Sequence, residues 1–354
     1  MSDNVEIWKL LQTAKRSESG IWLSQADSTE ISDAAYEQYM EGNYPQAIRL
    51  FKQAVQIAED NRDVKPQVHN KIWAGECLYQ AGRLKEALSF LLEAESLNDG
   101  NSKDYFDGII IQFNIAVQLP LPLTKINRIL MRISEYINTD DFRDCRPMYL
   151  AQKAELYKYR GMNNEEIETW LEAIANYIKH PKNYDLQSFY LGLFGAYYRA
   201  KDISRAEKAK SKYEEICRFQ YKEEKRTLHS MIGNLEMLKG NHDKAWNAYL
   251  EAYKIAEENK NNTQKDAIDL IDCGFELVQM PDLRPFLIEL SRLRHSESKL
   301  KQRQIYRCFA NYYKRCCTSG SANKKNLSRM NYYMNKRKTL SDFLNTQYEC
   351  ACYD

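Results

Sequence analysis

The side chains that most often perform catalysis or bind metal ions are few in this sequence and widely spaced. A glycine-rich phosphate loop, a nucleophile elbow, an HExxH motif and paired CxxC motifs are all absent from it. No two histidines have the four-residue spacing that places two ligands on one helix face; they are His69, His180, His229, His242 and His295. We therefore predict a protein that is not an enzyme and that uses no cofactor.

The nine cysteines are an odd number spread through 354 residues, which indicates reduced thiols rather than a disulfide framework. Reduced thiols favour the cytoplasm, with the nucleus as the alternative. Zinc sites usually pair ligands two to four residues apart and then repeat the pair. The late cysteines do not follow this spacing; they are Cys308, Cys316, Cys317, Cys350 and Cys352. We expect ordinary thiols, partly buried on helix faces, and no metal site.

Charge is unevenly distributed, although 51 basic residues nearly balance 49 acidic ones. From Ser291 to Leu340 there are 14 basic residues and Glu297 is the only acid, so this stretch carries +13. Because the whole chain carries +2, the remainder carries −11. No apolar run is long enough to span a membrane, and the first residues are acidic where a signal peptide is basic. The sequence thus predicts no transmembrane segment.

The basic end of the chain is a candidate binding surface. Tyrosines such as Tyr312, Tyr313, Tyr332 and Tyr333 lie between its cations. Basic residues mixed with aromatic ones bind RNA, single strands or anionic lipid head groups, and they also dock on acidic proteins. The basic end could instead neutralise the protein's own acidic helices. The predicted surface consists of Arg303, Arg307, Lys314, Arg315, Lys324, Lys325, Arg329, Lys336, Arg337 and Lys338.

A spacing of about 40 residues organises the chain. Gly42, Gly82, Gly161 and Gly240 each precede an amphipathic stretch, at intervals of 40, 79 and 79 residues. The same interval predicts turns near residues 121, 201, 280 and 320. Turn-like sequences occur at each place: Pro120-Leu-Pro122, Ala200-Lys-Asp202, Met280-Pro281 and Gly320. Eight turns on one interval predict an internal repeat.

Apolar residues on both sides of these turns have helical spacing. After Gly82, for example, the apolar residues are Leu84, Ala87, Leu88, Leu91 and Ala94. Offsets of three and four place them on one face of a helix. Almost no segment alternates with the period of a strand. Each repeat is therefore predicted to be a helix, a short turn and a second helix, which makes the protein all-α.

The second helices share a pattern of small and large residues. It occurs as Ala47-x3-Phe51-x2-Ala54, Ala87-x3-Leu91-x2-Ala94 and Ala245-x3-Tyr249-x2-Ala252. This pattern resembles the second-helix signature of tetratricopeptide repeats, in which a small residue lets two helices cross closely. One repeat departs from the pattern, since Glu166 takes the small-residue position. The family's closing proline is also missing. The resemblance covers roughly residues 29 to 343.

The resemblance implies a right-handed α-solenoid of about eight helix-turn-helix units. A period near 40 residues is similar to the long-helix branch of the family, which includes α-SNAP-like proteins and bacterial Rap-type regulators. Residues 1–28, with Val5, Trp8, Leu11, Ile21 and Trp22, are expected to cap the first unit. We predict an acidic repeat array over residues 29–290 and a basic, tyrosine- and cysteine-rich end over residues 291–354.

In the family, first helices of successive units line a groove that holds partners. The resemblance carries this role to Tyr36, Tyr39, Glu76, Tyr79, Gln80, Glu155, Lys158, Tyr159, Tyr198 and Arg199. Such an aromatic, mixed-charge lining suits an extended or helical protein segment. The leading hypothesis is a scaffold or adaptor that binds a protein partner within a larger complex. A scaffold that binds RNA or an anionic membrane through its basic end, and a peptide-sensing regulator, remain as alternatives.

Overall fold

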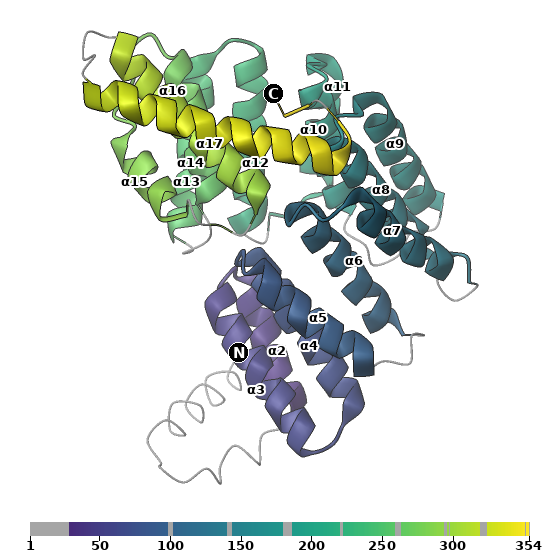
Figure 1. Ribbon diagram of the computed structural model, residues 1–354. Helices are drawn as coiled ribbons and strands as arrows, with labels where there is room; N and C mark the ends of the chain where they lie inside the picture. Colours follow the sequence, from purple (N-terminus) through teal and green to yellow (C-terminus); the bar gives the residue numbers. More distant parts are fainter. Residues whose placement is uncertain are drawn as a thin grey trace. The chain divides into compact units, whose positions relative to one another are not determined.

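A computed structural model describes residues 28–97, 102–139, 144–179, 186–219, 222–258, 263–293, 296, 298–318, 324–350 and 352–353. These residues form sixteen helices and include no strand (Figure 1), which confirms the all-α prediction. The predicted cap, with Val5, Trp8, Leu11, Ile21 and Trp22, lies outside the described residues apart from Ser28. His180, His295, Glu297 and the turn at Gly320 also lie outside them.

The helices follow one another as eight pairs, as the repeat predicts. The first three pairs are α2 (Ser28–Met40) with α3 (Tyr44–Asp60), α4 (Val64–Gln80) with α5 (Leu84–Leu97), and α6 (Lys103–Gln118) with α7 (Leu123–Ile137). The next three are α8 (Arg146–Tyr159) with α9 (Asn163–Lys179), α10 (Leu186–Arg199) with α11 (Ile203–Ile216), and α12 (Lys222–Leu238) with α13 (His242–Glu258). The last two are α14 (Gln264–Glu276) with α15 (Arg284–Leu293), and α16 (Lys299–Thr318) with α17 (Lys324–Tyr348).

The chain divides into two compact bodies within α6. The N-terminal body ends at Gln112, and the C-terminal body begins at Phe113. The change to basic composition after residue 290 falls inside the C-terminal body. Within this body, first helices of consecutive pairs pack on one another: α8 on α10, α10 on α12, and α14 on α16. In the N-terminal body α2 packs on α4 in the same way.

The four turns at Gly42, Gly82, Gly161 and Gly240 share one hydrogen-bonding geometry. Gly82 has a φ of 76°, its N–H donates to the Tyr79 carbonyl at 2.9 Å, and the Arg83 N–H donates to the Leu78 carbonyl at 2.9 Å. This arrangement satisfies two carbonyls that the end of a helix leaves without partners, and it needs a residue with positive φ. The turns at Gly42, Gly161 and Gly240 repeat it. The glycine spacing therefore marks real helix ends.

Three further turns predicted from the interval are confirmed. The turn near residue 201 uses the glycine geometry without glycine, because Lys201 has a φ of 57° and its N–H donates to the Tyr198 carbonyl at 3.0 Å. The turns near residues 121 and 280 separate α6 from α7 and α14 from α15. Neither turn contains a glycine with positive φ, which explains why glycines alone indicate only half of the predicted turns.

Small residues permit close contact between the two helices of a pair. Ala47, Ala87 and Ala245, the expected small residues, are fully buried. A Cβ added at Gly75 would lie 2.9 Å from the side chain of Leu91, and one added at Gly233 would lie 2.5 Å from Tyr249. These distances are shorter than packed carbon atoms allow, so the first helix needs glycine where the large residue of the second helix packs. No helix among the described residues is long and apolar enough to cross a bilayer.

Candidate functional site

The predicted groove residues of the N-terminal body gather around a tryptophan. The Tyr36 and Tyr39 rings of α2 meet the Trp73 ring of α4 at centroid distances of 5.1 and 5.3 Å, both edge to face. Phe51 of α3 stacks on Trp73 at a centroid distance of 6.1 Å. Such ring pairs stabilise by about 0.5–1.5 kcal/mol each beyond their burial. Tyr36 remains 43% exposed, so the aromatic cluster reaches the surface.

A carboxylate lies beside this aromatic cluster. The Tyr39 hydroxyl donates to Glu76 Oε1 at 3.4 Å, and Gln80 Nε2 donates to the same oxygen at 2.7 Å. Burial raises the pKa of Glu76, and the two hydrogen bonds oppose that shift. Burial and the nearby Glu76 raise the pKa of Tyr39. Four predicted residues, Tyr36, Tyr39, Glu76 and Gln80, are thus brought together, and Tyr79 follows on the last turn of α4.

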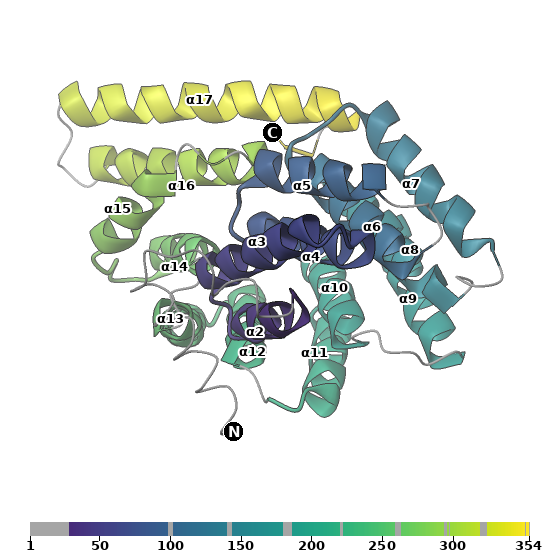
Figure 2. The same cartoon turned by 90° about the horizontal axis from the view of Figure 1, so that it is seen from below.

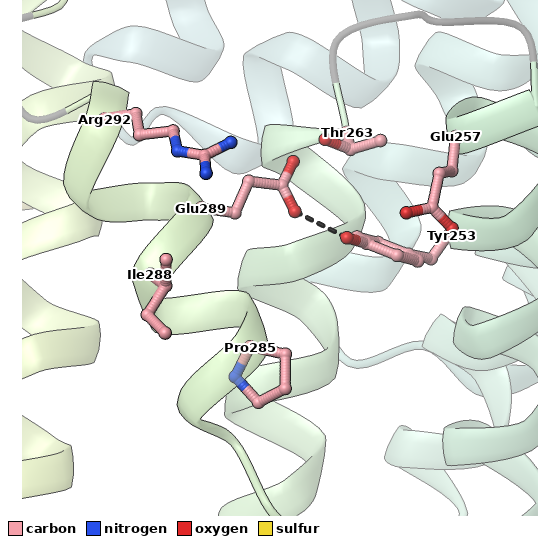
Figure 3. A pocket seen from close by; sticks show the side chains of 7 residues that line it. All are labelled: Tyr253, Glu257, Thr263, Pro285, Ile288, Glu289 and Arg292. Atoms are coloured by element: carbon pink, nitrogen blue, oxygen red, sulfur yellow. Dashed lines mark hydrogen bonds between the residues drawn. The ribbon is translucent and has the colours of Figure 1, made fainter.

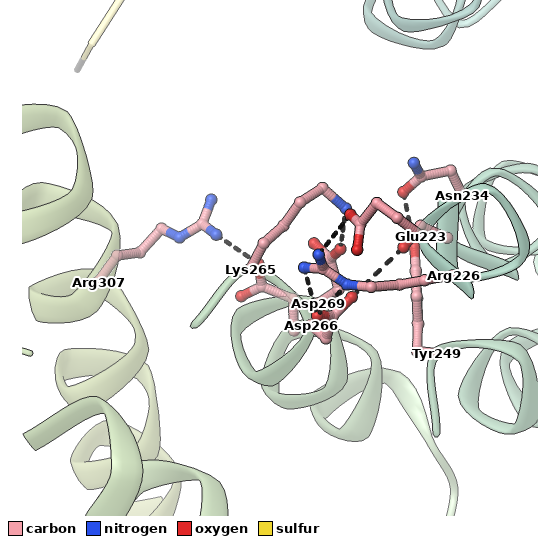
Figure 4. Close-up of polar contacts among 10 residues, drawn as sticks. Glu223, Arg226, Asn234, Tyr249, Lys265, Asp266, Asp269 and Arg307 are labelled. Atoms are coloured by element: carbon pink, nitrogen blue, oxygen red, sulfur yellow. Dashed lines mark hydrogen bonds and ion pairs between the residues drawn. The ribbon is translucent and has the colours of Figure 1, made fainter. Parts of the chain in front are cut away.

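In the C-terminal body a buried ion pair joins two first helices. Arg226 of α12 donates through Nε and Nη2 to Asp266 Oδ2 of α14, at 3.0 and 2.8 Å (Figure 4). The Asp266 side chain is 1% exposed, and Ser230 Oγ donates to its other oxygen at 3.4 Å. Burial alone would lower the pKa of Arg226, but Asp266 and Glu223 raise it. The ion pair therefore joins α12 to α14.

More exposed polar groups continue this surface onto α16. Lys265 Nζ donates to Asp269 Oδ2 at 2.7 Å, and Arg307 of α16 pairs with Asp272 of α14. Burial raises the pKa of Asp272 to about 6, although Arg307 opposes the shift. Tyr198 of α10 faces the same charges: burial, Asp269 and Asp272 raise its pKa, while Lys265 and Arg307 oppose the shift. We call this set the polar wall; it consists of Tyr198, Asn234, Lys265, Asp269, Asp272 and Arg307.

Three more groove predictions, Glu155, Lys158 and Arg199, take part in two ion pairs nearer the start of the C-terminal body. Arg199 of α10 pairs with Glu166 of α9, whose side chain is 1% exposed. Glu166 occupies the small-residue position of its pair, and Arg199 compensates for its buried charge. Burial raises the pKa of Glu166, while Arg199 lowers it. Lys158 Nζ donates to Glu155 Oε2 at 2.8 Å within α8. One ion pair therefore joins α10 to α9, and the other lies within α8.

Tyr159, the last groove prediction, is covered by residues from the end of the same chain. Its ring stacks on Tyr348 at 5.7 Å with an interplanar angle of 18°. The Tyr353 hydroxyl donates to the Tyr159 carbonyl at 2.9 Å. A partner can stack on the face of the Tyr159 ring that Tyr348 covers only after Tyr348 moves.

The ten basic residues predicted as one surface divide into two groups. Arg303 and Arg307 turn toward the body: Arg303 Nε donates to Ser341 Oγ at 2.7 Å, and Arg307 belongs to the polar wall. On the outer side, Arg329 lies over the Tyr313 ring at 5.5 Å and Lys336 over the Tyr332 ring at 5.8 Å. Tyr332 is 53% exposed. The outer basic group consists of Lys314, Arg315, Lys324, Lys325, Arg329, Lys336, Arg337 and Lys338.

A pocket of about 360 Å³ lies among α13, α14 and α15, away from every residue singled out in the sequence (Figure 3). The Tyr253 hydroxyl donates to Glu289 Oε2 at 2.6 Å across it. Burial raises the pKa of Glu289, and the Tyr253 hydrogen bond opposes this. Its lining is Tyr253, Glu257, Thr263, Pro285, Ile288, Glu289 and Arg292. The lining therefore combines two carboxylates and one arginine with an apolar edge.

The cysteines of the described residues are all free thiols. Cys308 is fully buried in the core beside Ile305 and Phe309, as a small apolar residue would be. Cys350 and Cys352 lie together, with their sulfur atoms 3.1 Å apart. Among the described residues, no three His, Cys, Asp or Glu side chains are grouped as metal ligands.

Sequence reasoning did not identify the partners that join neighbouring pairs. Arg226 and Asp266 are 40 residues apart, which is one repeat, so a search for opposite charges at the repeat interval would have found them. Arg307 and Asp272, 35 residues apart, are close to the same interval. Trp73 lies on the first helix of its pair, one turn before Glu76, so its place beside the predicted tyrosines follows from helical spacing.

The comparisons with known proteins agree with this architecture. Residues 38–105 match the tetratricopeptide repeat family. No curated protein sequence matches the chain. Among solved structures, a Rap protein complexed with competence and sporulation factor is similar, with a TM-score of 0.60 and 13% sequence identity. The likeness covers 92% of this chain and 95% of the Rap protein.

A second structure is a signal transduction ATPase with numerous domains (STAND) protein with a tetratricopeptide repeat sensor, from Pyrococcus horikoshii. Its TM-score is 0.52 at 13% identity, and the likeness covers 98% of this chain. This chain spans only 53% of that protein's length. At such low identity these likenesses concern the fold. Residues 38–105 thus match the tetratricopeptide repeat family, and the fold of the chain is similar to that of a Rap protein.

Proposed function

We propose that this protein is a non-enzymatic scaffold in the cytoplasm, with the nucleus as an alternative, that binds an extended segment of a partner protein. The observation that carries the proposal is the polar wall, in which Tyr198, Asp269 and Arg307 stand on three different first helices of the C-terminal body. Donors and acceptors repeated from helix to helix suit the repeated backbone groups of an extended chain. The partner would make this protein a subunit of a larger complex.

The polar wall is held in place before a partner arrives. Arg226 and Asp266 fix α12 against α14, and Arg307 with Asp272 fixes α14 against α16. A rigid surface loses less conformational entropy on binding than a mobile one. The Rap structure of similar fold holds competence and sporulation factor, which supports a binding role for this architecture. A peptide-sensing regulator would use the same wall, with a short peptide in place of a subunit.

The test is a pull-down from the native cell with mass spectrometry, before and after nuclease treatment. We compare the wild type with an Asp269→Ala/Asp272→Ala variant. The matched control is Asp282→Ala, which removes an exposed carboxylate that pairs with Arg284 on the turn before α15. The proposal expects a nuclease-resistant partner that the wall variant loses and the control keeps. A partner retained by both variants would contradict it.

A second candidate function rests on the outer basic group of α16 and α17. Here exposed cations stand beside exposed Tyr332, Leu327 and Met334. This combination suits RNA, on whose bases aromatic rings stack, or an anionic membrane surface. Reversing Lys324, Lys325, Lys336 and Lys338 to Glu should abolish binding to labelled RNA. That binding should also weaken steeply with salt because phosphate contacts release counterions. Salt-independent RNA binding would exclude this role.

A further inference from the structure

Residues at the end of α17 leave α16 and lie across two other helices. Tyr348 is fully buried, its ring stacks on Tyr159 of α8, and its hydroxyl donates to the carbonyl of Val117 on α6. The Tyr353 hydroxyl donates to the Tyr159 carbonyl at 2.9 Å. We call residues 348–350, 352 and 353 the strap. The strap therefore joins residues that are about 190 to 230 positions apart in the chain.

The strap occupies a site with unpaired acceptors. Val117 and Tyr159 are in the last turns of α6 and α8, where carbonyl groups have no partner within their own helix. The two phenol hydroxyls supply donors to these carbonyls, and the thiols of Cys350 and Cys352 also donate to the Tyr159 carbonyl, at 3.9 and 3.6 Å. The ring stacking between Tyr348 and Tyr159 covers the apolar part of the same surface. This surface therefore contacts both the ring and the hydroxyl group of the strap's tyrosines.

The backbone of the site also matches its occupant. Gly161 has a φ of 70°, and a Cβ added there would lie 2.7 Å from the Cβ of Cys352. Glycine at this position therefore allows the positive φ with which α8 ends, and it also leaves space for the strap. Arg303 supports the strap from the other side, because its guanidinium lies 5.5 Å from the Tyr353 ring centroid and donates to the Tyr353 carbonyl.

The site lies at the end of α8, which is the first helix of its pair, as are the helices that carry the polar wall. We infer that the surface around Tyr159 is a docking site for a tyrosine-bearing segment of the partner protein, and that the strap fills this site until such a segment displaces it. The inference rests on the proposed function and deepens it. The strap shows what the site accepts: a ring on Tyr159 and hydroxyl donors for the carbonyls of Val117 and Tyr159.

The test uses the full chain and a fluorescent peptide that copies residues 345–353, with serine at both cysteine positions. In a loosened variant, Tyr348→Phe keeps the buried ring but removes its hydroxyl, and Tyr353→Ala removes the second phenol. Because the competing strap is weakened, the peptide should bind this variant about ten-fold more tightly than the wild type. Tyr332→Ala, an exposed tyrosine of α17 outside the strap, is the matched control and should bind as the wild type does.

Two further measurements decide the location of binding. Adding Tyr159→Ala to the loosened variant should abolish peptide binding, because the stacking surface is lost. In the wild type, saturating peptide should speed amide hydrogen exchange in residues 344–350. Equal affinity for the wild type and the loosened variant, or no saturable binding to the loosened variant, would overturn the inference. A Tyr159-dependent dimer of the loosened variant would also overturn it, since a second copy would then fill the site.

The outcomes separate this inference from the proposed function. The peptide titration uses no partner, and the pull-down with the Asp269→Ala/Asp272→Ala variant does not involve the strap. A wall-dependent partner whose recovery is the same for the wild type and the loosened variant would contradict the inference alone. Peptide binding at Tyr159 without any wall-dependent partner would contradict the proposed function and leave the docking site supported.

Discussion

The first helices of the two bodies carry different chemistry at corresponding places. In the N-terminal body, α2 and α4 meet through the rings of Tyr36, Tyr39 and Trp73. In the C-terminal body, α12 and α14 meet through the ion pair of Arg226 and Asp266. The helix-turn-helix repeat therefore determines where side chains of neighbouring first helices meet. It leaves open whether they meet as rings or as charges.

The aromatic interface and the ionic interface should differ in how much stability each loses after a single substitution. An aromatic cluster loses one of several ring contacts when one ring is removed, and each contact contributes about 0.5–1.5 kcal/mol. A buried ion pair that loses one partner leaves an uncompensated charge in the interior. We therefore expect the interface between α12 and α14 to be more sensitive to single substitutions than the interface between α2 and α4.

The largest expected effect is that of Asp266→Asn, which preserves shape but removes the buried counter-charge of Arg226 and leaves only the exposed Glu223 as its partner. We expect a loss of about 3–5 kcal/mol in the free energy of unfolding of the C-terminal body. The matched change in the N-terminal body is Tyr36→Ala, which should cost about 1 kcal/mol because that ring is 43% exposed. Urea unfolding followed by circular dichroism measures both. Equal losses would show that the two interfaces do not differ in sensitivity.

What could be predicted from the sequence depends on how far apart the interacting residues lie. The glycine turns and the alanines of the second helices depend on neighbours within one pair, so helical spacing and one interval were enough to predict them. Arg226 and Asp266 belong to neighbouring helix pairs. The repeat interval indicates that their helices correspond, but it does not indicate which side chains form the ion pair. The cover over Tyr159 comes from a segment nearly 190 residues away. No periodicity predicts such a contact, because it depends on how the pairs curve.

The steric rule for small residues should act equally in both bodies. Ala87 of the N-terminal body and Ala245 of the C-terminal body are both fully buried. Replacing either with Leu adds volume to a packed interior and should cost about 1–3 kcal/mol. Thermal melts of Ala87→Leu and Ala245→Leu, with Leu92→Ala at an exposed position as the control, would measure this. An unchanged melt for either alanine variant would show that its helix pair is not closely packed there.

Asp272 gives the C-terminal body a pH dependence that can be measured. Its pKa of about 6 in the folded state lies above the value of about 3.9 expected in the unfolded chain. The folded state thus binds the proton more tightly, and stability from this group rises as the pH falls below 6. Asp272→Asn should therefore be more destabilising at pH 5 than at pH 7, by about 1 kcal/mol. Urea unfolding at both pH values measures the difference, and a constant effect would contradict the raised pKa.

The smallest expected effect compares one turn from each body. Gly82 and Lys201 both have positive φ, a conformation that costs a residue with a Cβ about 1–2 kcal/mol and glycine almost nothing. A Cβ at Gly82 would meet nothing within 4 Å, so Gly82→Ala should destabilise the N-terminal body by about 1 kcal/mol through conformation alone. Lys201→Gly removes the conformational cost but adds freedom to the unfolded chain, so it should stabilise the C-terminal body by only about 0.5 kcal/mol. Chemical denaturation of both variants measures the two shifts, and shifts of the same sign would show that the two turns do not share one conformational rule.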